Sequence, residues 1–255
     1  MTKSFETTII DITKENIDDH PQVVCFINKK HPTHHLKHEW ILKRFKDGLK
    51  IKLLFIEEEK KPVGYIEYIP GEQAWRAVDA PDHMFIHCLW TNGKKYQHQG
   101  LGTLLLDACE KDAQSKAGVA VITSDGAFMA HKDIFIKNGF TEIAQQGKDM
   151  LLSKTYKKKA QQVSFKDHEK QLKKLNGFHI LYSKQCPWVA RFIQEIDESI
   201  IEKYNIKIKE FTTAKQAQNA PSIYSIFNLI YDGKILADRY ISNTRFNNIL
   251  KKLKL

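Results

Sequence analysis

A short glycine-containing segment constrains the fold of this chain most. Residues 96–102 read Tyr-Gln-His-Gln-Gly-Leu-Gly, and the apolar run before them, Met84–Trp90, has the composition of a buried strand. The run after them carries apolar residues at helical spacing: Leu101, Leu104, Leu105 and Ala108. The sequence therefore predicts a strand, a tight loop and a helix over about residues 101–117.

Such a loop is a candidate site for a pyrophosphate group. The start of a helix presents unpaired backbone N–H groups and the positive end of the helix dipole to one spot. Glycines at 100 and 102 leave that backbone open to a phosphate. Neither common nucleotide loop fits, because no Gly-Lys-Ser/Thr follows and Leu105 stands where a dinucleotide fold has its third glycine.

The spacing Gln-x-x-Gly-x-Gly resembles the acetyl-CoA loop of the GNAT acyltransferase superfamily, which follows the fourth strand of that fold. The downstream order is also similar. A strand at Gly118–Thr123 is followed by a short helix at 130–138 that ends in Gly139-Phe140. The resemblance covers roughly residues 5–155 and implies an α/β (α+β) GNAT fold with a mixed central sheet.

The resemblance also implies where acetyl-CoA binds. In the superfamily the fourth strand splays from the fifth, so its free backbone groups pair with the pantetheine arm and one N–H binds the oxyanion. Phe135 stands where the family often has a tyrosine acid, and we expect it to pack against the same arm. The implied cofactor-binding residues are Leu89, Trp90, Thr91, Gln97, His98, Gln99, Gly100, Leu101, Gly102, Thr103 and Phe135.

The general base is less well defined by the sequence. His87 and Cys88 lie on the splayed strand, and strand alternation predicts that they point to opposite faces. Imidazole is the natural proton acceptor near pH 7, which favours His87. Glu67, Asp125 and a chain of waters are alternatives.

The opening part of the chain has the superfamily's order of elements. Thr13 is expected to cap a helix that begins near Lys14. The other predicted elements are a strand at Glu6–Ile12, a helix at His34–Lys46, a hairpin of Lys50–Glu57 and Val63–Ile69, and a strand at Asp149–Tyr156 that closes the sheet.

A second, smaller unit is expected from Gly177. Its predicted elements are a strand at His179–Ser183, a helix at Val189–Tyr204, strands at Ile206–Phe211, Ile223–Tyr231 and Ile235–Ile241, and a last helix at 243–253. This order, an Asp232-Gly233 turn, and the segment Tyr182–Trp188 resemble a thioredoxin or glutaredoxin core. Pro221 falls where that fold keeps a cis-proline.

The second cysteine of the glutaredoxin segment is replaced by Val189, so an internal thiol–disulfide cycle cannot operate. We interpret the unit as a packing and binding module. A low-pKa thiol at Cys186, at the start of a helix, is the alternative.

The expected division is therefore residues 1–155 as a GNAT domain, 156–176 as a lysine-rich linker and 177–255 as a thioredoxin-like domain. The net charge of +10 lies almost wholly in the C-terminal part, because residues 1–150 hold 20 basic and 21 acidic side chains whereas 151–255 hold 20 and 9. We interpret the lysine-rich connector as a solvated linker helix rather than a phosphate-binding stripe, so a nucleic-acid partner is not expected.

Composition excludes several other classes of protein. The four cysteines, at 25, 88, 109 and 186, are too scattered for a disulfide framework or a zinc ribbon, and a reducing cytoplasm is expected. No apolar run is long enough for a membrane span.

A histidine cluster at 31, 34, 35 and 38 is interpreted as lining an acceptor pocket rather than as a metal site. Trp75-Arg76 is interpreted as an acceptor contact or as surface packing.

The sequence thus predicts an N-acetyltransferase that moves an acetyl group from acetyl-CoA directly to a primary amine of a small molecule or peptide. The alternative is a CoA-binding, thiol-dependent sensor without turnover. The acceptor and the oligomeric state stay open, because pocket-forming loops vary freely in such folds.

Overall fold

The computed structural model describes residues 5–96, 98–126 and 129–253. Two compact units are present: Met1–Asn28, Leu42–Ala74 and Asp79–Ser164 form the first, and Lys29–Ile41, Trp75–Val78 and Phe165–Leu255 form the second.

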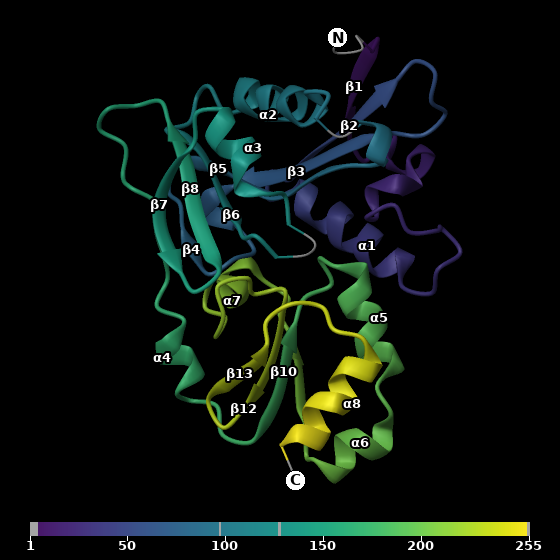
Figure 1. Cartoon of the computed structure of the whole chain (residues 1–255), viewed down its shortest axis with the longest axis vertical. Helices are drawn as coiled ribbons and strands as arrows, with labels where there is room; N and C mark the ends of the chain where they lie inside the picture. The colour runs from purple at the N-terminus through teal and green to yellow at the C-terminus, as the bar shows by residue number, and fades with distance from the viewer. Residues whose placement is uncertain (1–4, 97, 127–128, 254–255) are drawn as a thin grey trace. The chain divides into compact units, whose positions relative to one another are not determined.

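The first unit is built on a mixed seven-stranded sheet with the order β1-β2-β3-β5-β6-β8-β7 (Figure 1). All neighbouring pairs are antiparallel except β5 and β6, which are parallel. The strands are β1 (Thr7–Ile12), β2 (Lys50–Ile56), β3 (Gly64–Pro70), β5 (His83–Thr91), β6 (Gly118–Thr123), β7 (Thr141–Gln146) and β8 (Asp149–Thr155). The predicted mixed sheet is confirmed, but β7 rather than the 149–156 strand lies at its edge.

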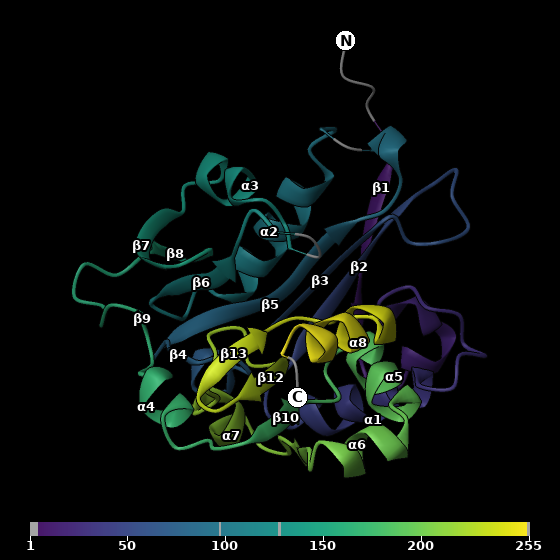
Figure 2. The ribbon, with the colours of Figure 1, turned by 60° about the horizontal axis from the view of Figure 1, so that its bottom comes forward.

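Helices α2 (Leu101–Asp112) and α3 (Lys132–Lys137) cover one face of this sheet (Figure 2). The apolar stripe of α2 packs on the strands in a single core. Contact is close, since a Cβ built on Gly64 of β3 would lie 2.9 Å from Cδ1 of Leu105. Helix α2 ends at Asp112, five residues before the predicted end.

The predicted helix near Lys14 is wrong. Two 3-10 turns, η1 (Ile17–Asp19) and η2 (Pro21–Val23), stand in its place. The Asn16 side chain donates to the Asp11 carbonyl and accepts from the Thr13 N–H, and Pro21 removes a backbone donor, so a continuous helix cannot form.

The next helix, α1 (His34–Phe45), agrees with the prediction. It ends because Gly48 adopts a left-handed conformation, with φ +86°, and its N–H donates to the Phe45 carbonyl at 3.1 Å.

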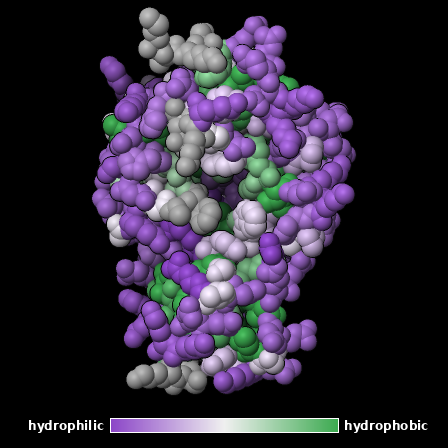
Figure 3. Space-filling view, turned by 45° about the vertical axis from the view of Figure 1, so that its right-hand side comes forward, coloured by the Kyte–Doolittle hydropathy of each residue, from purple (hydrophilic) through white to green (hydrophobic). Residues whose placement is uncertain are grey.

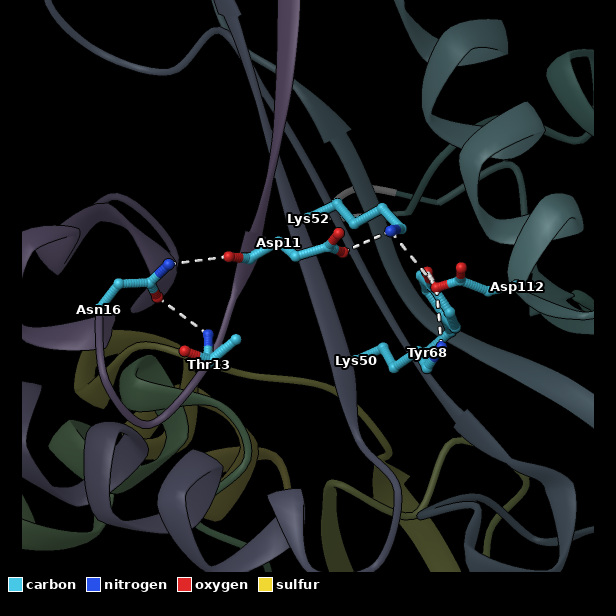
Figure 4. A network of polar contacts seen from close by, with 7 residues as sticks. All are labelled: Asp11, Thr13, Asn16, Lys50, Lys52, Tyr68 and Asp112. Atoms are coloured by element: carbon cyan, nitrogen blue, oxygen red, sulfur yellow. Dashed lines mark hydrogen bonds and ion pairs between the residues drawn. The ribbon is translucent and has the colours of Figure 1, made fainter.

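A buried lysine ties β1 to α2 (Figure 4). The Lys52 ammonium contacts Asp11 and lies 3.3 Å from Asp112, although its side chain is only 8% exposed. Asp112 also accepts from the Tyr68 hydroxyl at 2.6 Å and pairs with Lys50 at 3.0 Å. Burial lowers the pKa of Lys52, but its bonds to the two aspartates outweigh burial and raise it.

The second unit contains a four-stranded sheet with the order β11-β10-β12-β13. Strands β10 and β11 are parallel, and the other pairs are antiparallel. The strands are β10 (Phe178–Tyr182), β11 (Lys207–Glu210), β12 (Phe227–Tyr231) and β13 (Lys234–Ala237). The predicted turn at Asp232-Gly233 is confirmed, with φ +45° and +70°.

The predicted helix at 189–204 is instead two helices, α5 (Pro187–Glu195) and α6 (Glu198–Lys203). The break follows from Asp197, whose side chain accepts from the Ser199 N–H at 2.9 Å and so starts a new helix. A further helix, α7 (Ala214–Gln218), was not predicted, although Thr213 and Gln216 form a capping box for it. The last helix is α8 (Asn243–Lys252).

Two segments far upstream complete this unit. The Thr33 hydroxyl donates to the Pro187 carbonyl at 3.1 Å, and the Ala77 N–H donates to the Ile223 carbonyl at 3.2 Å. Arg76 is only 2% exposed, donates to Gln185 at 2.7 Å and stacks on Tyr224 at 4.5 Å. The interpretation of Trp75-Arg76 as a surface or acceptor contact is therefore wrong, because both side chains are buried.

The lysine-rich connector is not the expected helix. It contains a two-residue strand, β9 (Ser164–Phe165), which pairs with β4 (Val78–Asp79). A single turn of helix, α4 (Glu169–Leu172), follows. Several of its lysines are paired rather than free, as in the 2.9 Å contact between Lys157 and Asp82.

Among the residues that the structure describes, no helix is long and apolar enough to cross a membrane. Hydrophilic side chains predominate on the face drawn in Figure 3, and hydrophobic ones form small separate groups.

Candidate functional site

The predicted loop does lead into a helix start. His98 and Gly100 both adopt left-handed backbone, with φ +61° and +78°, and Gly100 is the N-cap of α2. The Leu104 N–H donates to the Gly100 carbonyl at 3.2 Å, so the N–H groups of residues 101–103 precede the helical bonds. Gln97 lies outside the described residues.

The two glycines of the loop have different surroundings. A Cβ on Gly100 would meet no atom within 4 Å, so its backbone is open. A Cβ on Gly102 would lie 2.3 Å from Cδ1 of Ile134 on α3, so packing of two helices explains this glycine. Asn138 donates to the Thr103 hydroxyl at 3.3 Å, which also joins α3 to the first turn of α2.

Polar contacts fix the entrance of the loop. The 3-10 turn η4 (Lys94–Tyr96) precedes it, and both Lys95, at 2.6 Å, and the Tyr96 hydroxyl contact Glu59. The hydrogen bonds from Lys95 and Tyr96 lower the pKa of Glu59. The Oε1 atom of Gln99 is buried, and no hydrogen-bond partner for it lies among the described residues.

Strand β5 extends beyond its parallel neighbour. Its described pairing with β6 runs from His83, opposite Gly118, to Ile86, opposite Val121. Residues 88–91 continue along β3, with Leu89 opposite Ile66 and Thr91 opposite Gly64. The described pairs with β6 thus end at Ile86, whereas those with β3 run on to Thr91.

A bulge in β5 places His87 and Cys88 on the same face of the sheet. Glu67 of β3 lies opposite Cys88 whereas Tyr68 lies opposite Ile86, so His87 is the extra residue. Ile86 and Leu89, three positions apart, both enter the core under α2. The expectation that His87 and Cys88 point to opposite faces is wrong, because it assumed unbroken alternation.

The bulge brings His87 to two further polar groups. Its Nδ1 lies 3.2 Å from Oε1 of Glu67, and the Tyr65 hydroxyl donates to Oε2 of Glu67 at 2.5 Å. The His87 and Glu67 side chains are 0% and 2% exposed. Burial, followed by the charge of Glu67 and the Cys25 and Cys88 thiols, raises the pKa of Tyr65 well above its usual value.

Glu67 was among the predicted alternatives for the base, but Tyr65 was not predicted. The signal was present, because Tyr65 and Glu67 are two apart on one strand and must share a face. Asp125, the other candidate base, is 61% exposed and pairs with His131 at 3.2 Å.

Phe135 does not fit the role expected for it. The ring is 1% exposed and packs edge-on against Phe140 at a centroid distance of 5.5 Å, within the core under α2 and α3. It offers almost no surface to a pantetheine arm, so we assign it to packing.

No group of metal-binding side chains is found among the residues that the structure describes. In the histidine cluster, the rings of His34 and His38 stack at 6.3 Å, and His31 lies 6.0 Å from Trp188.

Cys186 is the N-cap of α5, yet burial raises the pKa of its thiol. The rise in this pKa is opposed, but not cancelled, by backbone hydrogen bonds from Val189 and Trp188 and by the charges of Lys37 and Arg76. The direction of this shift favours the packing and binding interpretation over the alternative of a low-pKa thiol. The peptide bond before Pro221 is trans.

Comparisons with known proteins agree with this geometry. The acetyltransferase (GNAT) family model matches residues 12–130, and a YoaP-like family model matches residues 205–248. An uncharacterised N-acetyltransferase, YoaP, of Bacillus subtilis (strain 168) is 30% identical over 96% of this chain and 98% of its own length.

Solved structures that are similar to part of the chain include the PaiA N-acetyltransferase of Thermoplasma acidophilum in complex with coenzyme A. It is 16% identical, covers 59% of this chain and 99% of its own, and has a TM-score of 0.43. A GNAT-family acetyltransferase of Staphylococcus aureus Mu50 is 17% identical, covers 60% of this chain and all of its own, and has a TM-score of 0.45.

The family match and the full-length relative are consistent with the mixed sheet and with the loop at the start of α2. The chain belongs to the GNAT acetyltransferase family, and it is an acyltransferase that uses acetyl-CoA.

Proposed function

We propose that this enzyme transfers the acetyl group of acetyl-CoA directly to a primary amine of a small molecule or peptide. The observation that carries the proposal is the path of β5. This strand runs past its last described pair with β6 at Ile86 and leads through η4 into the open loop at Gly100.

The proposed donor site has two parts. Backbone N–H groups at the start of α2, together with the loop residues from Gln97 to Thr103, would hold the pyrophosphate. The backbone of Leu89, Trp90 and Thr91 would pair with the pantetheine arm, and one N–H there would stabilise the oxyanion. The open space at Gly100, and the described β5–β6 pairs that end before Leu89, support this arrangement.

The chemical step needs a proton acceptor. As the amine nitrogen attacks, a nitrogen–carbon bond forms, the carbon–sulfur bond breaks, and the amine proton must leave. We propose that His87 takes up this proton and that Glu67 holds its ring. The imidazole side chain is 0% exposed, so the amine proton would have to pass to it through a neighbouring group. We propose that the thiol of Cys88, on the same face of the sheet, is that group. A thiol with a pKa of about 8.5 leaves as thiolate without a dedicated acid, which fits the phenylalanine at 135.

Release of CoA from acetyl-CoA by the full chain, across a panel of amines, amino acids and peptides, tests the proposal. His87→Gln and Glu67→Gln should lower kcat by about 10²–10⁴-fold while acetyl-CoA binding is retained. Asp125→Asn is the control and should keep kcat within about twofold.

A large loss in Asp125→Asn with His87→Gln unaffected would move the base to Asp125. Binding of acetyl-CoA without CoA release for any amine would favour the sensor alternative instead.

We also propose that the second unit has a thioredoxin-like fold without redox activity. The order β11-β10-β12-β13, with β10 and β11 parallel, supports the topology. The raised pKa of Cys186 and the buried Val189 support the absence of dithiol chemistry. The full chain should not reduce insulin disulfides, and Val189→Cys should create a disulfide with Cys186 that dithiothreitol reduces. Strong reductase activity of the wild type would contradict this.

A further inference from the structure

The face of the sheet opposite α2 carries a set of side chains that the acetyl-transfer chemistry does not fully use. Tyr65 lies opposite Trp90, and Glu67 lies opposite Cys88, so all four share this face. Leu89 and Ile66, on the other face, belong to the core under α2. Trp90 is 44% exposed, although it follows directly on the buried Leu89.

A second aromatic ring is positioned against Trp90. The Phe26 ring lies 4.4 Å from the Trp90 ring, tilted by 58°, and 6.5 Å from the Tyr65 ring. Phe26 is half-buried, and it approaches from the segment after η2 rather than from the sheet. Its ring and the indole therefore form one partly exposed aromatic surface.

The backbone that presents Phe26 is strained. Cys25 and Phe26 both have left-handed backbone, with φ +49° and +57°. Two consecutive residues with a Cβ in this region are energetically unfavourable. Hydrogen bonds from Phe26 N to the Gln22 carbonyl at 3.0 Å, and from Ile27 N to the Val24 carbonyl at 3.1 Å, hold the conformation. Such strain persists where surrounding contacts enforce it and is common at binding sites.

The chemistry of this face selects one class of acceptor. The Glu67–His87 pair marks the end of this face where the amine nitrogen would react, and the aromatic surface of Phe26 and Trp90 on the same face suits an apolar group of the same molecule.

We propose that Phe26 and Trp90 determine acceptor specificity and that the acceptor is an arylalkyl primary amine. Its aromatic group stacks on the Phe26–Trp90 surface while its nitrogen faces the Glu67 and His87 end of the site. The proposal rests on the amine acetyltransferase function given above and adds the class of acceptor.

Kinetics of the full chain with two amines test it. The value of kcat/KM for 2-phenylethylamine should exceed that for n-propylamine by at least tenfold. In Phe26→Ala and in Trp90→Ala this ratio should fall toward one, mainly through a higher KM for the aryl substrate, whereas Phe26→Tyr should keep it. A tenfold change corresponds to about 1.4 kcal/mol of transition-state binding.

Trp188→Ala is the matched control, because Trp188 is similarly exposed, at 36%, and belongs to the second unit. It should leave the ratio unchanged. Thermal melts of each variant separate loss of selectivity from loss of fold. A wild type that acetylates propylamine or spermidine as well as phenylethylamine, or a ratio unchanged in both alanine variants, would overturn the specificity proposal. No CoA release with any amine would instead contradict the proposed function.

Discussion

At the residue scale, Gly102 illustrates a glycine that helix packing requires. A methyl group there would lie 2.3 Å from Cδ1 of Ile134. Gly102→Ala should therefore destabilise the protein by about 1–3 kcal/mol, and the better helix propensity of alanine offsets only part of this. Thermal melts measure the effect. Ile134→Val removes the clashing carbon, so Gly102→Ala with Ile134→Val should recover much of the loss; no recovery would contradict the packing explanation.

Gly100 has open space and a left-handed backbone, so its substitution tests ligand binding instead. Gly100→Val should weaken acetyl-CoA binding at least tenfold, about 1.4 kcal/mol, by calorimetry. Gly147→Val is the control, because Gly147 is left-handed as well, with φ +57°, and a Cβ there would also meet no atom within 4 Å. Gly147 lies in the turn between β7 and β8. Equal affinities in the two variants would remove the loop from the binding site.

Asp112 carries a pH-dependent share of stability. Burial works to raise the pKa of Asp112, but the bonds from Tyr68 and Lys50 and the charge of Lys52 outweigh it and lower the pKa. A folded pKa below the unfolded value of about 3.9 gives stability that is present above that pH and lost as the pH falls through the folded value.

Asp112→Asn should therefore lower stability at pH 7 by on the order of 1–2 kcal/mol, and the gap to wild type should close toward pH 3. Thermal melts at pH 7, 5 and 3 measure this. A gap that stays constant with pH would show that the carboxylate charge is not responsible.

At the element scale, periodicity predicted most strands and helices but not their interruptions. The apolar run at 84–90 identified β5. The bulge at His87, in contrast, depends on how β5 pairs with β3, whose Glu67 lies 20 positions before His87 in the sequence. The break between α5 and α6 is local, and Asp197 followed by Ser199 marks it. The apolar period simply continues across this break, so the pattern alone suggested one helix.

The cap at Asp197 can be tested directly. Asp197→Ala removes the acceptor for the Ser199 N–H and should cost about 1 kcal/mol in thermal or denaturant unfolding. Asp197→Asn keeps a capping oxygen and should stay within about 0.5 kcal/mol of wild type. An alanine variant as stable as wild type would mean that packing of the neighbouring helices, rather than the cap, sets the break.

At the scale of the whole molecule, sequence order and spatial grouping differ. The resemblance placed residues 1–155 in one domain, but Lys29–Ile41 and Trp75–Val78 group with the C-terminal residues. Nothing in the local pattern reveals this, because the contacts of Arg76 with Gln185 and Tyr224 join distant positions. The loop at Gly100, in contrast, is local and could be predicted.

The interleaved grouping predicts that residues 1–155 do not form a stable protein alone. The truncated chain would leave Arg76 without its contacts to Gln185 and Tyr224. It should be mostly insoluble, or melt well below the full chain, by circular dichroism. A truncated chain that melts like the full chain and releases CoA at a similar rate would contradict this.

The contact between Thr33 and Pro187 also concerns how the protein is made. These residues are 154 positions apart, so at about 5–20 residues per second the ribosome delivers Pro187 roughly 8 to 31 s after Thr33. Throughout that interval the helix that begins at His34 lacks its partner segment. We infer that the buried side chains of this helix, such as Trp40 and Ile41, emerge from the ribosome uncovered and stay so until the later segment has been made.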